Sequence, residues 1–301
     1  MGSKRVTNKI RFGIAGVGNQ AADNLMPVLQ CMNDVEIRAI SSHSGEQRAH
    51  NLAQRYGAVW STSTWRDLLN SEEIDAILVA APPSIHQEIA AACLEAGVHV
   101  FVEKPPATDL SSLERLARLA ANRSDITTFV DYNFRFGATY KMLLDAIQTE
   151  AKVTAARIRF VGSKPITPIW NQDSIERSFL YAFAIHAIEI VVSLFGSARH
   201  LDILYKNLDG SRFLLDLTIA FESGATACLA LGNYSTRFEY HVELVTSTSI
   251  IGILDQHCRV QITGAPGMDS FDQRFDRKQS LEYIWPSLRG GYDLSGYQGA
   301  L

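Results

Sequence analysis

Short apolar runs recur through the first 130 residues and alternate with segments of helical spacing. Five segments predict strands, at 10–15, 35–42, 74–81, 99–102 and 126–130, and the nearly continuous apolar runs at 74–81 and 99–102 predict burial on both faces. Helical spacing marks the segments at 19–32, 46–56, 84–95 and 109–122, with a shorter strand at 58–61 and a short helix at 64–70. Strands and helices that alternate in this way indicate an α/β fold with a doubly wound, parallel Rossmann sheet.

Two residues refine these helices. Pro27 is expected to kink the first helix, because its ring removes a backbone hydrogen bond. Ser84 is expected to cap the helix that stops before Gly97, by accepting a hydrogen bond from a backbone N–H of the first turn.

The pattern changes after residue 132. A helix at about 140–149 is followed by long alternating strands and by one very apolar helix at about 179–195. The strands are expected at 153–161, 212–221, 225–231, 240–246 and 259–263. We therefore predict two domains, a Rossmann domain at 1–132 and an α+β domain with a large antiparallel sheet at 133–301.

The strand at 225–231 suggests how copies of the chain associate. Its residues are small or apolar on both faces, which predicts burial on both sides. Helices of the same domain can cover only one face, so a partner sheet is the simplest cover for the other. We expect a homodimer or homotetramer built through the C-terminal sheet.

Composition narrows the class of protein. Of 301 residues, 47% are apolar and 20% charged, and the net charge of −4 favours neither nucleic acid nor an anionic membrane as partner. No apolar run approaches the roughly 20 residues that span a bilayer, and no signal-peptide core opens the sequence. Cys31, Cys93, Cys228 and Cys258 lack metal-ligand or redox spacing. We expect a cytoplasmic protein with reduced thiols and no metal site.

A glycine cluster follows the first strand. Gly16 and Gly18 allow a sharp turn and a close approach of the backbone to a ligand, and Ala21 allows tight packing of helix on strand. The pattern G-x-G-x-x-A is a variant of the dinucleotide fingerprint, with the pyrophosphate at the helix N-terminus. Asn19 and Gln20 open that helix and are expected to join the cofactor site.

With further motifs, the chain resembles the Gfo/Idh/MocA family, which includes glucose–fructose oxidoreductase and inositol dehydrogenase. The motifs are the glycine loop, Pro82-Pro83-Ser84-Ile85-His86, Glu103-Lys104-Pro105, Asn133-Phe134-Arg135-Phe136 and His186 in a later helix. The resemblance implies an NAD(P)-dependent oxidoreductase that transfers hydride to or from a small carbonyl or hydroxyl substrate, sugar-like or a biosynthetic intermediate.

The end of the second strand bears on the choice of cofactor. NAD-binding proteins of this kind place a carboxylate there to hold the ribose hydroxyls. Here the residues are Ser41, Ser42, His43 and Ser44. The pattern is similar to the Ser-Arg pair of NADP-using relatives, with His43 in place of arginine. We therefore favour NADP, with Ser42 and His43 as contacts, over NAD held by backbone groups.

Lys104 is the expected catalytic group of the first domain. It lies just past a parallel strand, where open α/β sheets place ligands, and the prolines after it stiffen the backbone. Its ammonium could stabilise or protonate a developing alkoxide. By resemblance, the cofactor contacts also include Ala81, Pro82, His86, Glu103, Lys104 and Asn133. His86 either lines the nicotinamide pocket or caps a helix.

His186 is the expected acid–base group of the second domain, against the alternative of a core histidine. Sugar and cyclitol dehydrogenases of the family carry an aspartate four residues earlier, on the same helix face, where this chain has Ala182. Tyr181 and Arg135 are candidate substrate contacts beside Lys104 and His186, although an interdomain ion pair is an equal alternative for Arg135.

Two rival functions remain open at this point. The missing aspartate and the apolar surroundings of His186 would suit an imine reductase or another tailoring enzyme of the same fold. A catalytically silent cofactor-binding sensor is the second rival. We also expect that the chain ends before a closing helix of the family, which would leave Tyr292, Leu294, Tyr297 and Leu301 without cover.

Overall fold

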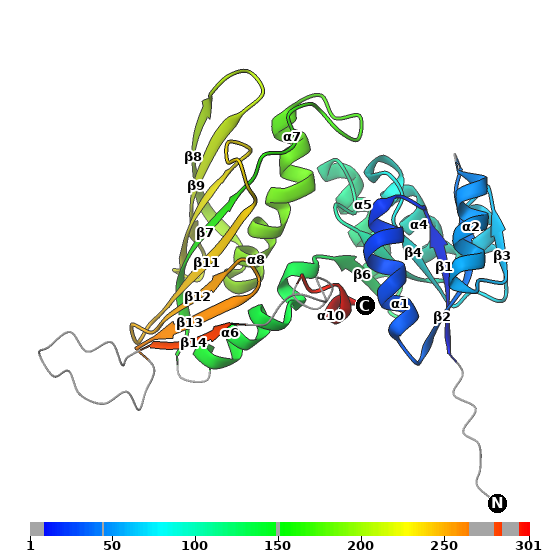
Figure 1. Ribbon diagram of the computed structural model, residues 1–301, viewed down its shortest axis with the longest axis horizontal. Helices are drawn as coiled ribbons and strands as arrows, with labels where there is room; N and C mark the ends of the chain where they lie inside the picture. The colour runs from blue at the N-terminus through cyan, green and yellow to red at the C-terminus, as the bar shows by residue number, and fades with distance from the viewer. Residues whose placement is uncertain (1–8, 44, 149–150, 265–279, 285–294) are drawn as a thin grey trace, which may run out of the picture. The chain divides into compact units, whose positions relative to one another are not determined.

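The computed structural model describes residues 9–43, 45–148, 151–264, 280–284 and 295–301 (Figure 1). The chain divides into two compact units. The first comprises Met1–Asp131 with Leu301, and the second comprises Tyr132–Ala300.

The first unit is built on a six-stranded parallel sheet. Its strands are β1 (Ile10–Ala15), β2 (Val35–Ser41), β3 (Trp60–Thr62), β4 (Ala76–Val79), β5 (His99–Glu103) and β6 (Thr128–Asp131). They lie in the order β3-β2-β1-β4-β5-β6, so the chain starts in the middle and winds outward in both directions. All four residues of β4 are buried, as expected for a central strand between two layers of helices. The predicted Rossmann fold is confirmed.

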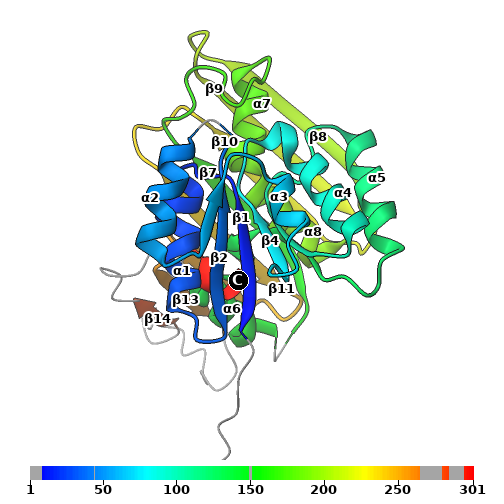
Figure 2. The same ribbon diagram turned by 90° about the vertical axis from the view of Figure 1, so that its right-hand side faces the viewer.

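Helices cover both faces of this sheet (Figure 2). They are α2 (Glu46–Tyr56), α3 (Arg66–Leu69), α4 (His86–Ala96), α5 (Leu110–Ala121) and a first helix in two parts, a π-helical turn η1 (Gln20–Leu25) and α1 (Met26–Cys31). Pro27 lies in the first turn of α1, so the irregularity that it was expected to cause occurs just before it.

The predicted cap at Ser84 is wrong. The two prolines before it lead into a 3₁₀ turn, η2 (Pro83–Ile85), in which Ser84 is exposed. The α-helix begins only at His86 and has no side-chain cap, because the residue at its N-cap is Ile85.

The second unit contains an eight-stranded sheet in the order β14-β13-β12-β11-β7-β10-β9-β8. Its strands are β7 (Val153–Val161), β8 (Ala198–Asn207), β9 (Phe213–Phe221), β10 (Thr226–Gly232), β11 (Glu239–Thr246), β12 (Ile251–Asp255), β13 (Arg259–Thr263) and β14 (Ser280–Ile284). Strands β7 and β10 pair in parallel and every other described pair is antiparallel. The sheet expected to be antiparallel is therefore mixed.

Strands β8, β12 and β14 have no counterpart in the sequence-based prediction. Strand β8 lies at the edge of the sheet, all ten of its residues are exposed, and its apolar positions do not alternate cleanly. Strand β12 is only five residues long and contains Gly252, which weakens a strand signal.

Helices pack on one face of this sheet and close its core (Figure 1). They are η3 (Asn133–Phe136), α6 (Ala138–Gln148), α7 (Ile175–Phe179), the π-helical turn η4 (Leu180–Ala184) and α8 (Ile185–Phe195). The short helix α10 (Tyr297–Ala300) packs against η3 instead. The apolar helix starts at Ile175, four residues before the predicted start, where the side chain of Ser174 accepts a hydrogen bond from the backbone of Arg177.

The continuous helix Ile175–Phe195 corrects the expectation that no apolar segment approaches the length of a membrane span. Among the described residues it is the one helix long and apolar enough for that. About half of it is buried within this unit, and Phe195 packs against Phe221 of β9 with ring centroids 5.1 Å apart. It is the inner helix of a two-layer unit.

None of the described helices covers the other face of the sheet (Figure 1). Thr226 and Cys228 of β10 are exposed there, so the predicted burial on both faces is not met within one copy. Ion pairs flank this strip, including Arg157 with Glu243 and Arg159 with Glu239.

The C-terminal segment is described only in part. Tyr292 and Leu294, which the sequence suggests would lack cover, lie outside the described residues. Residues 295–300 pack onto η3, where the side chain of Asn133 donates a hydrogen bond to the backbone oxygen of Ser295 at 2.7 Å and Ala300 is buried. The described part of this segment therefore has cover within the chain.

Candidate active site

The turn after β1 brings three strand ends into contact. Gly16 has a φ of +110°, and an added Cβ would lie 2.5 Å from the backbone oxygen of Ala80, at the end of β4. Its own N–H donates to the backbone oxygen of Ser41, at the end of β2, at 3.0 Å. Only glycine satisfies both the conformation and the space at this position.

Gly18 occupies a different environment. It is exposed, and an added Cβ would meet nothing within 4 Å, so the backbone is open to a ligand on that side. Asn19 precedes η1, and Ala21 in its first turn is fully buried. The loop thus has the form that a dinucleotide fingerprint requires, with one glycine needed for the turn and one facing open space.

The end of β2 lies beside this loop. Ser42 is buried, His43 is exposed, and Ser44 lies outside the described residues. Arg48 in α2 donates from Nη2 to Oδ1 of Asn19 at 3.2 Å, which places a guanidinium at the glycine loop. Arg48 is not among the site residues predicted from sequence, although a basic residue in the first turns of the helix after strand two is a usable signal.

The end of β5 carries the next part of the site. The carboxylate of Glu103 is buried and accepts hydrogen bonds from Nε2 of Gln20 at 2.6 Å and from the backbone N–H of Lys104 at 3.1 Å. Oε1 of Gln20 in turn accepts from Nδ2 of Asn24 at 2.8 Å. The helix after the glycine loop is therefore tied directly to the strand that presents Lys104.

Lys104 is partly exposed at this strand end. Burial of its stem and ammonium lowers its pKa from the usual value, and the charges of Glu103 and Asp131 oppose that change. A lysine whose pKa is lowered is better able to exchange a proton near neutral pH.

Asp131 is a component of this edge that sequence analysis did not identify. It ends β6 directly opposite Glu103 in the parallel register and is completely buried. No described residue donates a hydrogen bond to either of its carboxyl oxygens. Burial raises its pKa well above the usual value, the charge of Glu103 raises it further, and Lys104 has the opposite effect. Its place directly after the apolar run predicted at 126–130 was a usable sequence signal, because the ends of parallel strands meet at one edge of the sheet.

His86 holds two loops together. Its ring is buried, with Nδ1 2.8 Å from the backbone oxygen of Pro105 and Nε2 2.7 Å from that of Ala81. A neutral imidazole carries one N–H and can donate to only one of these oxygens. Burial lowers the pKa of His86, whereas both carbonyl groups oppose this. Of its expected neighbours, Pro82 is exposed and Ala81 is partly exposed.

In the second unit, His186 lies at the start of α8 and is 6% exposed. Its ring stacks on that of Phe134, with centroids 4.1 Å apart and planes 10° from parallel. The ring of His257 is perpendicular to that of the same phenylalanine, with ring centroids 4.4 Å apart. Burial lowers the pKa of His257 to about 4. His186 thus belongs to an aromatic cluster that also includes Tyr240.

The remaining predicted substrate contacts are also in the second unit. Arg135 donates to Oε1 of Glu189 in α8 at 2.7 Å. Both residues belong to Tyr132–Ala300, so this ion pair is not the interdomain pair considered from sequence. Burial raises the pKa of Glu189, against the effect of Arg135. Tyr181 in η4 lies beneath the guanidinium of Arg177, with 5.7 Å from that group to the ring centroid.

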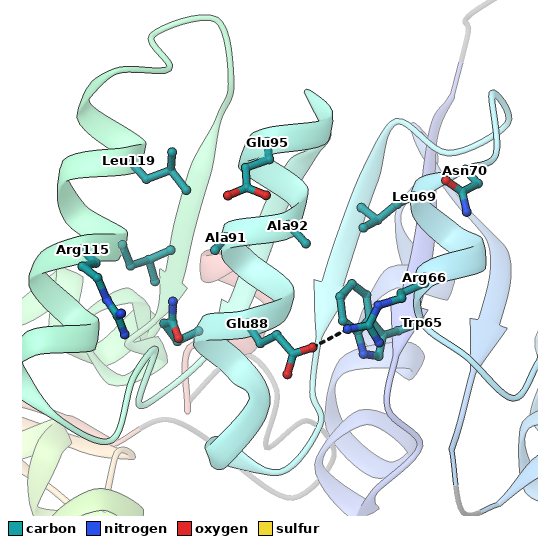
Figure 3. A pocket seen from close by; sticks show the side chains of 12 residues that line it. Trp65, Arg66, Leu69, Asn70, Glu88, Ala91, Ala92, Glu95, Arg115 and Leu119 are labelled. Carbon is teal, nitrogen blue, oxygen red and sulfur yellow. Dashed lines mark hydrogen bonds and ion pairs between the residues drawn. The ribbon is translucent and has the colours of Figure 1, made fainter.

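A groove of about 720 Å³ lies elsewhere, on the outer surface of the first unit (Figure 3). Leu69, Ala91 and Leu119 line it, and an ion pair between Arg66 and Glu88 closes one wall. It contains none of the predicted site residues. Within the described part of the chain, no three His, Cys, Asp or Glu side chains gather as a metal site would need.

Comparison with known proteins agrees with the geometry of the glycine loop and the lysine strand. Residues 10–132 match the profile GFO_IDH_MocA, described as an oxidoreductase family with an NAD-binding Rossmann fold. A crystal structure of a dehydrogenase from Chromobacterium violaceum is 30% identical, with a TM-score of 0.87 over 97% of this chain and 85% of that one. This chain belongs to the Gfo/Idh/MocA family.

Two more distant relatives extend the comparison. Myo-inositol 2-dehydrogenase from Thermotoga maritima is 24% identical over 62% of this chain and 55% of its own, so the chain spans about half the length of that relative. Levoglucosan dehydrogenase, solved with NADH and levoglucosan, shares the fold at 18% identity, with a TM-score of 0.81 over 97% of this chain and 88% of that one. The protein is an NAD(P)-binding oxidoreductase.

The two glycines of the loop should respond differently to substitution. Gly16→Ala should lower the free energy of unfolding by roughly 2–4 kcal/mol, because its Cβ would overlap Ala80 in a strained conformation. In Gly18→Ala the added Cβ has open space around it, so the free energy of unfolding should change by no more than about 1 kcal/mol. Urea titration of both variants measures this, and equal losses would contradict the assignment of the tight turn to Gly16.

Proposed function

We propose that the protein transfers hydride between a nicotinamide cofactor and the hydroxyl or carbonyl carbon of a small sugar-like molecule. One observation carries this proposal. The hydrogen bond between Gln20 and Glu103 joins the helix of the glycine loop to the strand that presents Lys104. A cofactor held at the loop and an ammonium at the strand end therefore occupy one rigid edge of the sheet, where ligands of such sheets bind.

The described residues fit a dinucleotide. Gly16, Gly18, Asn19 and Gln20 would hold the pyrophosphate, since the loop backbone is open at Gly18. Ala81, Pro82 and Glu103 belong to the neighbouring strand ends, and His86 positions two of these loops through its ring nitrogens. When bound, the cofactor supplies or accepts the hydride.

Lys104 acts on the substrate oxygen. Its ammonium stabilises the alkoxide charge that develops when a carbonyl is reduced, or donates a proton to it. In the direction of oxidation the same nitrogen, once neutral, accepts the hydroxyl proton. Its lowered pKa supports both roles, because at neutral pH a smaller free-energy difference then separates the charged ammonium from the neutral amine.

His186 is the second acid–base group in this proposal. Stacking on Phe134 fixes the plane of its ring, a function that a hydrogen-bonded aspartate could otherwise serve. Arg135 and Tyr181 are substrate contacts in the same unit, although the pairing of Arg135 with Glu189 means that binding must compete with that ion pair. The side-chain amide nitrogen of Asn133 donates to the backbone oxygen of Ser295. We therefore propose that Asn133 supports the cofactor site by holding this loop in place and not by a direct hydrogen bond from that nitrogen.

The substrate class rests on the relatives. Their names refer to myo-inositol and levoglucosan, a cyclic polyol and an anhydrosugar. Ala182 is buried where sugar dehydrogenases of the family carry aspartate, which favours a less hydroxylated substrate, such as the imine or ketone of a tailoring reaction, as the second candidate. Turnover of NADH and NADPH with carbonyl and imine panels, and of NAD⁺ and NADP⁺ with polyols, decides between them. No turnover with any panel would favour a cofactor-binding sensor.

NADP is the preferred cofactor in this proposal. Ser42 and His43 bring no carboxylate to the ribose, and Arg48 places a positive charge at the glycine loop. A 2′-phosphate carries close to two negative charges and pairs well with a guanidinium. Glu46, at the start of α2, is the nearest carboxylate along the chain and is exposed. Structural relatives of lower identity were solved with NAD or NADH, so a direct comparison of NADPH and NADH binding is needed to test this preference.

The fold is that of a soluble enzyme, and we propose a cytoplasmic homodimer or a tetramer built from it. The uncovered face of the second sheet supports association through that face. On this face strand β10 exposes small side chains, Thr226 and Cys228, which allow two sheets to approach closely. Paired charges on β7 and β11 lie along one side of this strand and give the face a polar border there.

Replacement of Lys104 tests the chemistry. Lys104→Ala should lower kcat by roughly 10²–10³-fold, because one stabilising donor is lost from the transition state. The affinity for NADPH, measured by fluorescence, should stay within about threefold, since the glycine loop is intact. Lys206→Ala, an exposed lysine of β8, is the control. Normal turnover in the Lys104 variant would exclude Lys104 as the group that acts on substrate oxygen.

Cofactor preference is tested at two residues. The wild-type protein should bind NADPH more tightly than NADH. Arg48→Ala should weaken NADPH binding roughly tenfold and leave NADH binding unchanged, because only the phosphate contact is lost. Ser42→Asp should move the preference toward NADH by charge repulsion. Arg55→Ala, exposed on the same helix, is the matched control. A wild-type preference for NADH would overturn the assignment.

Association is tested by light scattering at micromolar concentration. The mass of the wild-type protein in solution should be two or four times the 33.3 kDa of one chain. Cys228→Arg should give a monomer, because a long charged side chain would separate the two sheets. Ser124→Arg, on an exposed loop of the first unit, should leave the oligomer intact. A monomeric wild type would contradict the proposal.

A further inference from the structure

The first unit contains a buried carboxyl group that the proposed chemistry does not use. Asp131 and Glu103 end neighbouring parallel strands as register partners, so their side chains leave the same face of the sheet. Adjacent strands lie about 4.8 Å apart. Glu103 is 5% exposed and Asp131 is not exposed at all. Two carboxyl groups are therefore held side by side, away from water.

The surrounding groups do not balance two negative charges. Lys104 is the one described cation whose charge acts on Asp131. His86, on α4, also senses Glu103 and Lys104, but both of its ring nitrogens are engaged with backbone oxygens. The carboxylate of Glu103 accepts hydrogen bonds from Gln20 and from a backbone N–H, whereas no described residue donates to Asp131.

A buried carboxylate without donors is unstable relative to its protonated form. A proton on Asp131 removes the second charge and also creates a donor, and the neighbouring carboxylate of Glu103 is an acceptor with lone pairs to spare. Two carboxyl groups in contact commonly share one proton for this reason.

We propose that Asp131 is a positioning residue for Lys104: it is held as a neutral carboxylic acid that donates a hydrogen bond to Glu103, and its proton sets the acidity of Lys104. This inference rests on the proposed role of Lys104. With Asp131 neutral, one carboxylate faces one ammonium, and Lys104 gives up its proton readily. When Asp131 ionises, a second negative charge holds the proton on Lys104. The raised pKa of Asp131 agrees with this arrangement.

Infrared spectroscopy tests the protonation state without any substrate. Protein carrying ¹³C-labelled aspartate should show, at pH 7, a carbonyl band of a protonated carboxylic acid that is absent from Asp131→Asn. The label separates this band from those of glutamates such as Glu189. Asp125→Asn, an exposed aspartate on the loop before β6, should keep the band. If labelled wild-type protein shows only carboxylate bands at pH 7, the proposal is overturned, even where the asparagine variant does not fold.

Competitive acetylation of Lys104, followed by mass spectrometry across pH, tests the coupling. In Asp131→Asn the apparent pKa of Lys104 should fall by about one unit or more, because wild-type Asp131 has ionised at the alkaline pH where Lys104 titrates, whereas asparagine carries no charge at any pH. An unchanged value would show that Asp131 does not act on Lys104. The measurement needs no turnover, so its failure is separate from a failure of Lys104→Ala to lose activity.

Thermal unfolding gives an independent readout. An unfolded aspartate ionises near pH 3.9, whereas native Asp131 keeps its proton to higher pH. The native state therefore binds one more proton over that interval, and wild-type stability falls as pH rises through it. Asp131→Asn lacks this loss, so its melting temperature should exceed that of wild type at pH 8 and match it near pH 4. A variant less stable by the same amount at both pH values would contradict a neutral acid.

Discussion

The approach of Gly16 to Ala80 is the constraint on which the first unit depends. At this point the ends of β1, β2 and β4 come together with no space for a side chain. Because the turn is tight, η1 begins at Gln20, and the side chain of that residue reaches Glu103 on the next strand but one. The cofactor loop and the lysine strand are therefore set by packing of backbone on backbone, which is more rigid than contacts between long side chains.

The sheet of the first unit could be predicted from sequence because its strands leave short apolar runs, most clearly at β4, where every residue is buried. The second sheet was harder. Strand β8 lies at an edge with every residue exposed, so burial does not impose an alternating pattern on it. Ser84 shows a different limit. Its residue type favours a helix cap, but the prolines beside it determine where the helix starts.

The site was predicted in outline and missed in detail. Lys104 and the glycine loop belong to short motifs whose spacing in sequence fixes their position at the sheet edge. Arg48 and Asp131 reach the same edge from a later helix and the last strand, and only the three-dimensional register shows that they do so. The neutral state inferred for Asp131 depends on the absence of donors around it in the described structure, which no local sequence pattern reports.

The π-helical turn at Leu180–Ala184 affects how the loss of the family aspartate is interpreted. A regular α-helix places residues four apart on one face, but a π turn carries one more residue per turn and rotates what precedes it. The turn widens the helix just before His186, so the offset between position 182 and the imidazole differs from that of a regular α-helix although the two still share a face. An aspartate introduced at 182 would therefore meet His186 in a geometry set by the π turn. The local helix type, and not only the residue at 182, decides what that position can contact.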